Sequence, residues 1–272
     1  MHDYYPAAAL LLLVGMGIAM KMGHRLGVAE YKRNPSAAGK GVSAIDGAIF
    51  ALFGLLLAFT FSGAASRFEN RRDLVVQEVN AISTAYLRLE LLQKPDQTKL
   101  KPLFRTYVES RIKTYQLIAQ GTDVAMIEFA RSQDLQNEIW HTATAASTKT
   151  GNPAVMSLAL APINEMIDIT TTRLAATRAH PPLVIYGLLF AFAIASSLLA
   201  GYSASFSKEH HWLHKVLFAI CITGTIYATL DMEYPRLGLI RSDAMDLHFH
   251  ELLQSIQPST PERLGNSAQI YS

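Results

Sequence analysis

Long uncharged apolar stretches alternate along this chain with amphipathic stretches. The uncharged stretches cover residues 4–20, 47–66, 181–207 and 216–230. A membrane-spanning helix needs about 20 apolar residues, so the first three stretches predict membrane spans. The fourth holds only 15 residues. It can span if the amine of Lys215 extends to the interface and Trp212 lies there, and we interpret all four stretches as spans.

The first apolar stretch has an alternative interpretation as a cleaved signal peptide. The residues before it, MHD, carry no Lys or Arg, and basic residues follow the stretch instead. A signal peptide has the opposite arrangement, with its positive segment first. We therefore expect a permanent membrane helix.

Residues 67–180 predict a helical extramembrane domain, because apolar residues recur there at helical spacing and no strand pattern appears. We expect one helix to stop at Pro95, Asp96 to cap the next, and Gly121 and the loop TKTGNP to separate the others. Nothing breaks the sequence between the second span and the helix that follows, so one long helix should leave the bilayer. The predicted organisation is spans one and two with a basic loop in 1–66, the helical domain in 67–180, spans three and four in 181–232, and an extramembrane segment in 233–272.

Composition supports a membrane protein and gives no sign of an enzyme. The chain has 272 residues, of which 50% are hydrophobic and 17% charged, with a formal net charge of +2. No nucleic-acid partner is indicated by that charge. The single cysteine, Cys221, excludes a disulfide within the chain. The sequence holds no nucleophile with a plausible base, no phosphate-binding loop and no HExxH motif, so we expect neither catalysis nor a cofactor.

Charge alone does not orient the chain in the membrane. The loop between spans one and two carries five basic residues and only Glu30 as an acid, which by the positive-inside rule favours a cytoplasmic loop. Five arginines flank the spans on the side of the helical domain: Arg67, Arg71, Arg72, Arg173 and Arg178. The two sides are close to balanced.

Three separated stretches resemble the bestrophin superfamily, and most closely the bacterial bestrophin-like domain membrane proteins. The stretches are ALFGLLLAFTFSGAASRFENRRDLVVQEVNA, RAHPPLVIYGLLF and ATLDMEYPRLGLIRSDAMD. They resemble the second membrane helix of bestrophins, the proline-containing start of a later helix, and the acidic E-x-P-x-G turn after the last span. The residues that carry the resemblance are Arg67, Phe68, Pro181, Pro182, Asp231, Glu233, Pro235 and Gly238.

This resemblance implies a homopentameric ion channel whose pore is lined by the second membrane helix. It also implies that both termini and the helical domain are cytoplasmic, here in a bacterial inner membrane. Aligning Arg67 with the family's arginine assigns the hydrophobic neck of the pore to Ala51, Leu55 and Phe59, which share one helical face. Leu55 and Phe59 suit a gate that excludes water, whereas Ala51 is smaller than the usual residue. The alternative is that these side chains face lipid or protein.

Asp46 begins the second span and is a candidate for the pore entrance. A ring of carboxylates there would favour cations. Alternatively, Asp46 is an interfacial carboxylate that the helix dipole stabilises at a helix N-terminus.

Two groups of residues were considered as metal ligands. Asp231, Glu233, Asp243 and Asp246 precede His248 and His250, and could bind calcium, but they lack the dense acidic run of the animal bestrophins' calcium clasp. We expect Glu233 and Asp231 to pair with arginines such as Arg236 or to cap helices. His210, His211 and His214 could contribute to a zinc site, yet a polar loop explains them more simply. We expect no metal site, and we expect Glu165, Asp168 and Arg173 to form structural ion pairs.

The sequence thus predicts an all-α, bestrophin-like integral membrane protein, with four transmembrane helices and a helical domain inserted between spans two and three. We expect it to be a homo-oligomer in the lipid bilayer that conducts small inorganic ions. The alternative function is a non-conducting membrane scaffold or sensor that presents its helical domain to a partner.

Overall fold

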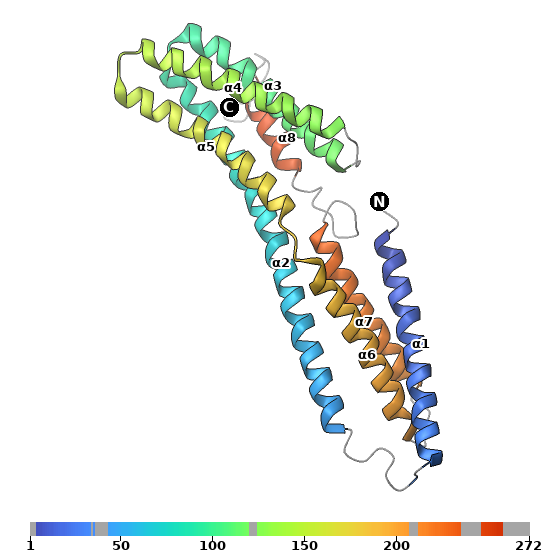
Figure 1. Cartoon of the computed structure of the whole chain (residues 1–272). Helices are drawn as coiled ribbons and strands as arrows, with labels where there is room; N and C mark the ends of the chain where they lie inside the picture. The colour runs from blue at the N-terminus through green and yellow to red at the C-terminus, as the bar shows by residue number, and fades with distance from the viewer. Residues whose placement is uncertain are drawn as a thin grey trace, which may run out of the picture. The chain divides into compact units, whose positions relative to one another are not determined.

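The computed structural model describes residues 4–33, 35, 43–119, 124–206, 212–234 and 246–257, and every regular element within them is a helix. In chain order, the elements are α1 (Tyr4–Arg33), α2 (Ser43–Arg88), the 3₁₀ turn η1 (Leu89–Leu91), α3 (Lys94–Ala119), α4 (Val124–Lys149), α5 (Pro153–Arg178), α6 (Leu183–Ser203), the 3₁₀ turn η2 (Ala204–Phe206), α7 (Trp212–Glu233) and α8 (Asp246–Ser255) (Figure 1). Four helical stretches are long and apolar enough to cross a membrane. The predicted all-α membrane fold is confirmed.

The second span and the polar helix after it form one continuous helix. Helix α2 contains 46 residues, and Figure 1 shows it without a break. No proline lies within it, so no backbone hydrogen bond is lost where the apolar sequence changes to a charged one. The prediction of a single long helix is therefore confirmed, and residues of its two halves share one helical register.

The chain divides into two compact units. The first, called here the membrane unit, comprises Met1–Asn70 and Arg178–Arg241. The second, called here the helical unit, comprises Arg71–Thr177 and Ser242–Ser272.

Within the membrane unit, α1 and α6 pack with their backbones in close approach. A Cβ atom placed on Gly201 would lie 2.0 Å from the carbonyl oxygen of Met20, and one on Gly23 would lie 1.9 Å from that of Leu198. Only glycine permits such an approach, which is how membrane helices gain close packing. The core of the unit joins all four membrane helices through Met16, Phe53, Leu189, Ile226 and their neighbours.

The helical unit has an ordinary apolar core. Its members include Ile82 of α2, Phe104 of α3, Ile139 of α4, Ile163 of α5 and Phe249 of α8. The helices are amphipathic, and burying one stripe of each stabilises the unit as in a water-soluble bundle.

Some helix boundaries differ from those expected. Helix α2 already ends at Arg88, and Pro95 lies in the first turn of α3, which begins at Lys94. Proline is tolerated there because a first-turn amide has no intrahelical partner. Asp96 is not a cap but lies inside the first turn, where its Oδ1 accepts a hydrogen bond from Lys149 Nζ at 3.1 Å. The expected break at Gly121 falls outside the described residues, whereas the loop around Gly151 is confirmed, with φ +64°.

Candidate functional site

The membrane half of α2 has a packed face and an open face. On the packed face, the Phe53 ring stacks on Phe192 of α6 at a centroid distance of 6.3 Å. Phe50 meets Phe218 of α7 edge to face at 6.0 Å. Phe53, Leu57, Thr60 and Ala64 are all buried on this face. Among the described residues, the membrane half of α2 contacts the rest of its unit through this face.

The three predicted neck residues lie together on the open face. The side chains of Leu55 and Phe59 are 53% and 69% exposed, and Ala51 is also exposed. Their spacing of four residues stacks them one turn apart. A Cβ on Gly54, which neighbours them, would meet nothing within 4 Å. Phe59 is thus exposed on a membrane helix. Such exposure is expected both for a side chain that lines a pore and for one that contacts lipid.

The open face continues beyond the membrane half of α2. Eight further residues follow at intervals of three or four, and each is exposed: Ser62, Ser66, Glu69, Asp73, Gln77, Asn80, Thr84 and Leu87. The intervals average 3.6 residues, the period of the helix. We call the row from Ala51 to Leu87 the open stripe. The sequence analysis did not identify this row, because beyond Arg67 it considered only the spacing of apolar residues.

Asp46 lies on the opposite side of α2 from the neck residues. Nine residues separate it from Leu55, which at about 100° per residue places the two on opposite faces. Asp46 is 5% exposed, and Ser203 Oγ of α6 donates a hydrogen bond to its Oδ2 at 2.5 Å. Its other oxygen, Oδ1, has no hydrogen-bond partner among the residues that the structure describes. The structure does not bring Asp46 together with Ala51, Leu55 and Phe59.

The three stretches that resemble bestrophins meet at one buried carboxylate. Arg67 Nε of α2 donates to Glu233 Oε1 at 2.8 Å, and Glu233 at the end of α7 is 1% exposed. His180 Nδ1 lies 3.4 Å from Glu233 Oε2, and its ring stacks on Tyr234 at 4.6 Å. Glu233 does pair with an arginine, but with Arg67, whereas Arg236 lies outside the described residues.

The remaining residues that carry the family resemblance lie on α2, on α7 and between α5 and α6. Phe68 is half-buried on α2, and Asp231 is buried on α7. Pro181 and Pro182 join α5 to α6, where Pro182 precedes the first helical residue with φ −55° and ψ 140°. Pro235 and Gly238 lie outside the described residues.

The considered metal ligands form no metal centre in the part of the chain that the structure describes. No group of three or more His, Cys, Asp or Glu side chains there is arranged to hold an ion. His248 Nδ1 instead lies 3.5 Å from Glu251 Oε2 on α8. His210, His211 and Asp243 lie outside the described residues.

A cluster of buried charges in the helical unit was not foreseen. Arg111 Nε of α3 donates to Glu78 Oε1 of α2 at 2.7 Å, and Arg173 of α5 donates to Glu78 Oε2. The hydroxyl of Tyr115 donates to Glu78 Oε2 at 3.1 Å and accepts from Arg111. Sequence analysis had grouped Arg173 with its helical neighbours Glu165 and Asp168. Asp168 instead accepts from Asn164 at 2.8 Å.

Electrostatics within this cluster keep Glu78 ionised. Burial alone raises the pKa of Glu78, but the guanidinium groups of Arg111 and Arg173 outweigh it and lower the pKa to about 2. Burial also raises the pKa of Tyr115, to about 12. The tyrosine therefore remains a hydrogen-bond donor. Glu78 is therefore ionised at neutral pH, and the cluster is a charged, hydrogen-bonded element of the core.

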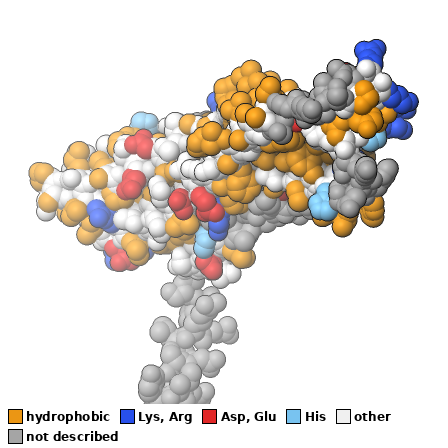
Figure 2. All heavy atoms as spheres, turned by 90° about the horizontal axis from the view of Figure 1, so that it is seen from below, with side chains coloured by type: hydrophobic (Ala, Val, Ile, Leu, Met, Phe, Trp, Pro, Cys, Tyr) orange, Lys and Arg blue, Asp and Glu red, His pale blue; other side chains and the backbone are white. Residues whose placement is uncertain are grey.

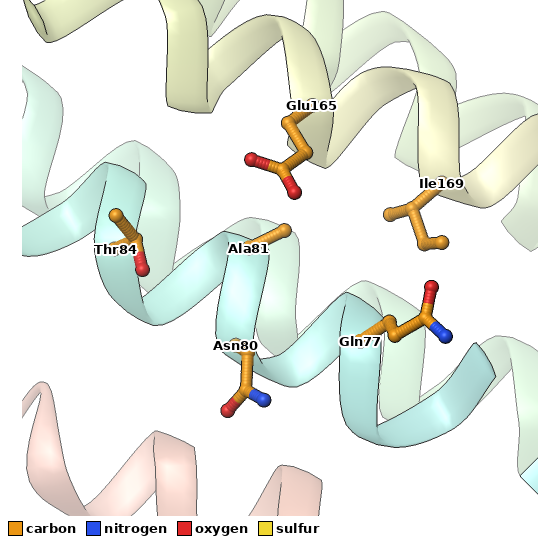
Figure 3. Close-up of a pocket in the computed structure, with 6 residues that line it drawn as sticks. All are labelled: Gln77, Asn80, Ala81, Thr84, Glu165 and Ile169. Carbon is orange, nitrogen blue, oxygen red and sulfur yellow. The ribbon is translucent and has the colours of Figure 1, made fainter. Parts of the chain in front are cut away.

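A pocket of about 250 Å³ opens between α2 and α5 in the helical unit. Its lining consists of Gln77, Asn80, Ala81, Thr84, Glu165 and Ile169. Figure 3 shows the Glu165 carboxylate and the Ile169 side chain directed from α5 toward α2. Three of the lining residues, Gln77, Asn80 and Thr84, belong to the open stripe. Four of these six side chains carry an oxygen atom, and no Lys or Arg is among the described residues that line the pocket.

Comparisons with known proteins agree with this architecture. The structure is similar to crystal structures of three single-residue variants of a bacterial bestrophin homologue from Klebsiella pneumoniae. The TM-scores are 0.69, 0.67 and 0.67 at 12%, 12% and 13% sequence identity. The matches cover 94%, 90% and 90% of this chain and 99%, 98% and 98% of those chains. At such identities the likeness concerns the fold.

Sequence comparison identifies the family. A comparison with curated proteins found no match. The family model of the bestrophin-like domain matches residues 32–241, which is most of the chain. The match includes α2, the helical domain, α6 and α7. The chain therefore belongs to the bestrophin-like domain family.

Proposed function

We propose that this protein is a homo-oligomeric ion channel whose pore is lined by the open face of the membrane half of α2. The observation that carries the proposal is the exposure of Leu55 and Phe59 on a helix that packs through its opposite face. Copies of α2 arranged around an axis would place these side chains in rings. The family resemblance favours five copies.

The proposed neck is formed by Phe59, Leu55 and Ala51. Apolar rings at a constriction exclude water and so oppose ion passage. Phe59 has the bulkiest of the three side chains and should form the narrowest ring, whereas the ring of Ala51 should be wider. Asp46 faces into its own subunit, so we do not include it in this lining.

Membership of the family and four apolar helices support an integral membrane protein. Hydrophobic side chains cover much of the surface in Figure 2. Among the exposed hydrophobic residues of the membrane unit are Leu188 and Val184 of α6 and Leu217 and Ile220 of α7. We propose a bacterial inner membrane location, with the termini and the helical unit in the cytoplasm.

A non-conducting scaffold is the competing function, because an exposed phenylalanine on a membrane helix can also face lipid. The two functions differ in assembly. A channel requires a ring of subunits, whereas a scaffold with lipid around α2 needs only one or two copies. Mass photometry of the detergent-solubilised protein distinguishes them: a mass of five protomers supports the channel, and one or two contradicts it.

Conduction is tested by reconstituting the purified protein in a planar bilayer. We expect Phe59→Ala to increase the current, because the largest ring of the barrier is removed. Leu188→Ala, which shortens another exposed apolar side chain on α6, should leave the current unchanged. An absence of current from wild type and Phe59→Ala alike would contradict the proposed function.

A further inference from the structure

The pocket of Figure 3 lies entirely within the helical unit, in a gap between α2 and α5. On α2 it is bounded by Ala81, a buried residue whose side chain is a single methyl group. Figure 3 shows this methyl group and the Glu165 carboxylate of α5 directed toward one another. Ile169 follows Glu165 by about one helical turn and lines the same gap. The small side chain of Ala81 therefore leaves a volume of about 250 Å³ next to a carboxylate.

Glu165 is the only charged residue among the described residues that line the pocket. Its carboxylate has no hydrogen bond or ion pair with any other residue that the structure describes. The arginines that follow on both helices are engaged elsewhere: Arg88 of α2 donates to the Leu158 carbonyl at 2.9 Å, and Arg173 of α5 donates to Glu78. No Lys or Arg lies within four residues of Glu165 on α5. The negative charge of the pocket is thus open to a cation from outside the chain.

The polar side chains of the pocket suit an ammonium group better than a metal ion. An ammonium group has three N–H donors and no acceptor. The lining offers it a carboxylate from Glu165 and further side-chain oxygens from Gln77, Asn80 and Thr84. Calcium, by contrast, takes about six to eight oxygen ligands, several of them from carboxylates. The described residues contain no group of three or more His, Cys, Asp or Glu side chains arranged to hold a metal ion.

We propose that this pocket binds a small primary alkylammonium ion, with its charged group at Glu165 and its alkyl chain against Ala81 and Ile169. A metal ion gains nothing from these two apolar side chains, whereas burying an alkyl chain against them is favourable. The pocket is smaller than the about 300–1,000 Å³ that is typical of sites for drug-sized ligands, so the ligand is short. Because Glu165 is exposed, water competes for its charge and binding is weak. The inference goes beyond the proposed channel function and does not depend on conduction.

The test is saturation-transfer difference NMR with n-butylammonium chloride as the probe. The full-length protein is held in nanodiscs of phosphatidylcholine, a lipid without net charge. We expect the wild type to transfer saturation to the alkyl protons of the probe, and Glu165→Gln to reduce this signal several-fold, because the charge that holds the ammonium group is removed. Glu138→Gln, which neutralises an exposed carboxylate on α4, is the matched control and should leave the signal unchanged.

A second variant tests the apolar part of the pocket while the carboxylate is retained. Ala81→Val adds two methyl groups to the gap and should also weaken the signal several-fold. Equal signals from wild type and Glu165→Gln overturn the proposal, and so does loss of the wild-type signal in millimolar CaCl₂, which would indicate a metal site. No signal from the wild type, as when a second copy covers the pocket, overturns it too. None of these outcomes bears on conduction, which the planar-bilayer currents test separately.

Discussion

The two halves of α2 differ in the kinds of side chain that they bury and expose. In the membrane half, both faces are apolar: Phe53 is buried against α6, while Phe59, six residues later, is exposed. In the half that belongs to the helical unit, the open face is polar, and the packed face buries Glu78 between two arginines. Hydrophobicity therefore does not distinguish inside from outside in the membrane half, whereas in the other half a charge is buried only because it is paired.

The largest expected effect breaks the paired charge. Glu78→Gln keeps the side-chain shape but leaves Arg111 and Arg173 buried without a carboxylate. Removing one partner of a buried ion pair costs about 3–5 kcal/mol of unfolding free energy. Thermal unfolding of the detergent-solubilised protein measures this loss. Glu138→Gln, at an exposed site, should change the unfolding free energy by less than about 0.5 kcal/mol. Equal stability of the two variants would show that the cluster does not stabilise the fold.

Lowering the pH should remove the stabilisation that ionised Glu78 provides, without a mutation. The two arginines lower the pKa of Glu78 from its ordinary value of 4.5 to about 2. A carboxylate with a lowered pKa contributes stability fully above pH 4.5, and this contribution is lost as the pH falls toward 2. The shift corresponds to about 3 kcal/mol. Unfolding curves recorded between pH 6 and pH 3 should show a smaller decline for Glu78→Gln than for wild type, and parallel declines would contradict the assignment.

A smaller effect is expected where α1 and α6 approach each other in the membrane unit. Gly201→Val places atoms against the backbone of Met20 and should cost about 1–3 kcal/mol through overpacking. Gly187→Val adds the same side chain elsewhere on α6, where nothing lies within 4 Å. Detergent-resistance or thermal-stability measurements should place Gly201→Val below Gly187→Val. The reverse order would mean that the two helices are not in close contact.

The smallest effect on stability is expected on the open stripe. Phe59 is exposed within its subunit, so Phe59→Ala should change the unfolding free energy of the subunit by about 0.5 kcal/mol or less. Phe53→Ala removes a buried ring and should cost clearly more. Comparing the two melting temperatures checks the assignment of the faces. A loss at Phe59 as large as at Phe53 would mean that the supposed open face is packed.

The sequence predicted the features that depend on local pattern. Apolar runs predicted the four spans, and the absence of a helix-breaking residue after Ser66 predicted the long helix α2. The period of 3.6 residues placed Leu55 and Phe59 on one face, and the same arithmetic would have shown Asp46 on the opposite one.

Pairings between distant residues were not predictable in this way. Arg67 and Glu233 are 166 positions apart, and Glu78 and Arg173 are 95 apart. Each of these charged residues has closer oppositely charged neighbours in the sequence, and only the packing of the helices selects the partner. The helix boundary predicted at Pro95 was wrong for a different reason, since proline suits both the end of one helix and the first turn of the next.

The central claim is that the open face of α2 meets water rather than lipid, and thiol accessibility tests it most directly. Cys221 is first replaced by Ala, since it is an exposed thiol, and Phe59→Cys and Leu188→Cys are then made separately. A charged, membrane-impermeant thiol reagent is applied during current recording in a planar bilayer. The account predicts that the reagent alters the current of Phe59→Cys but not that of Leu188→Cys. An unreactive Phe59→Cys in a conducting protein would contradict it.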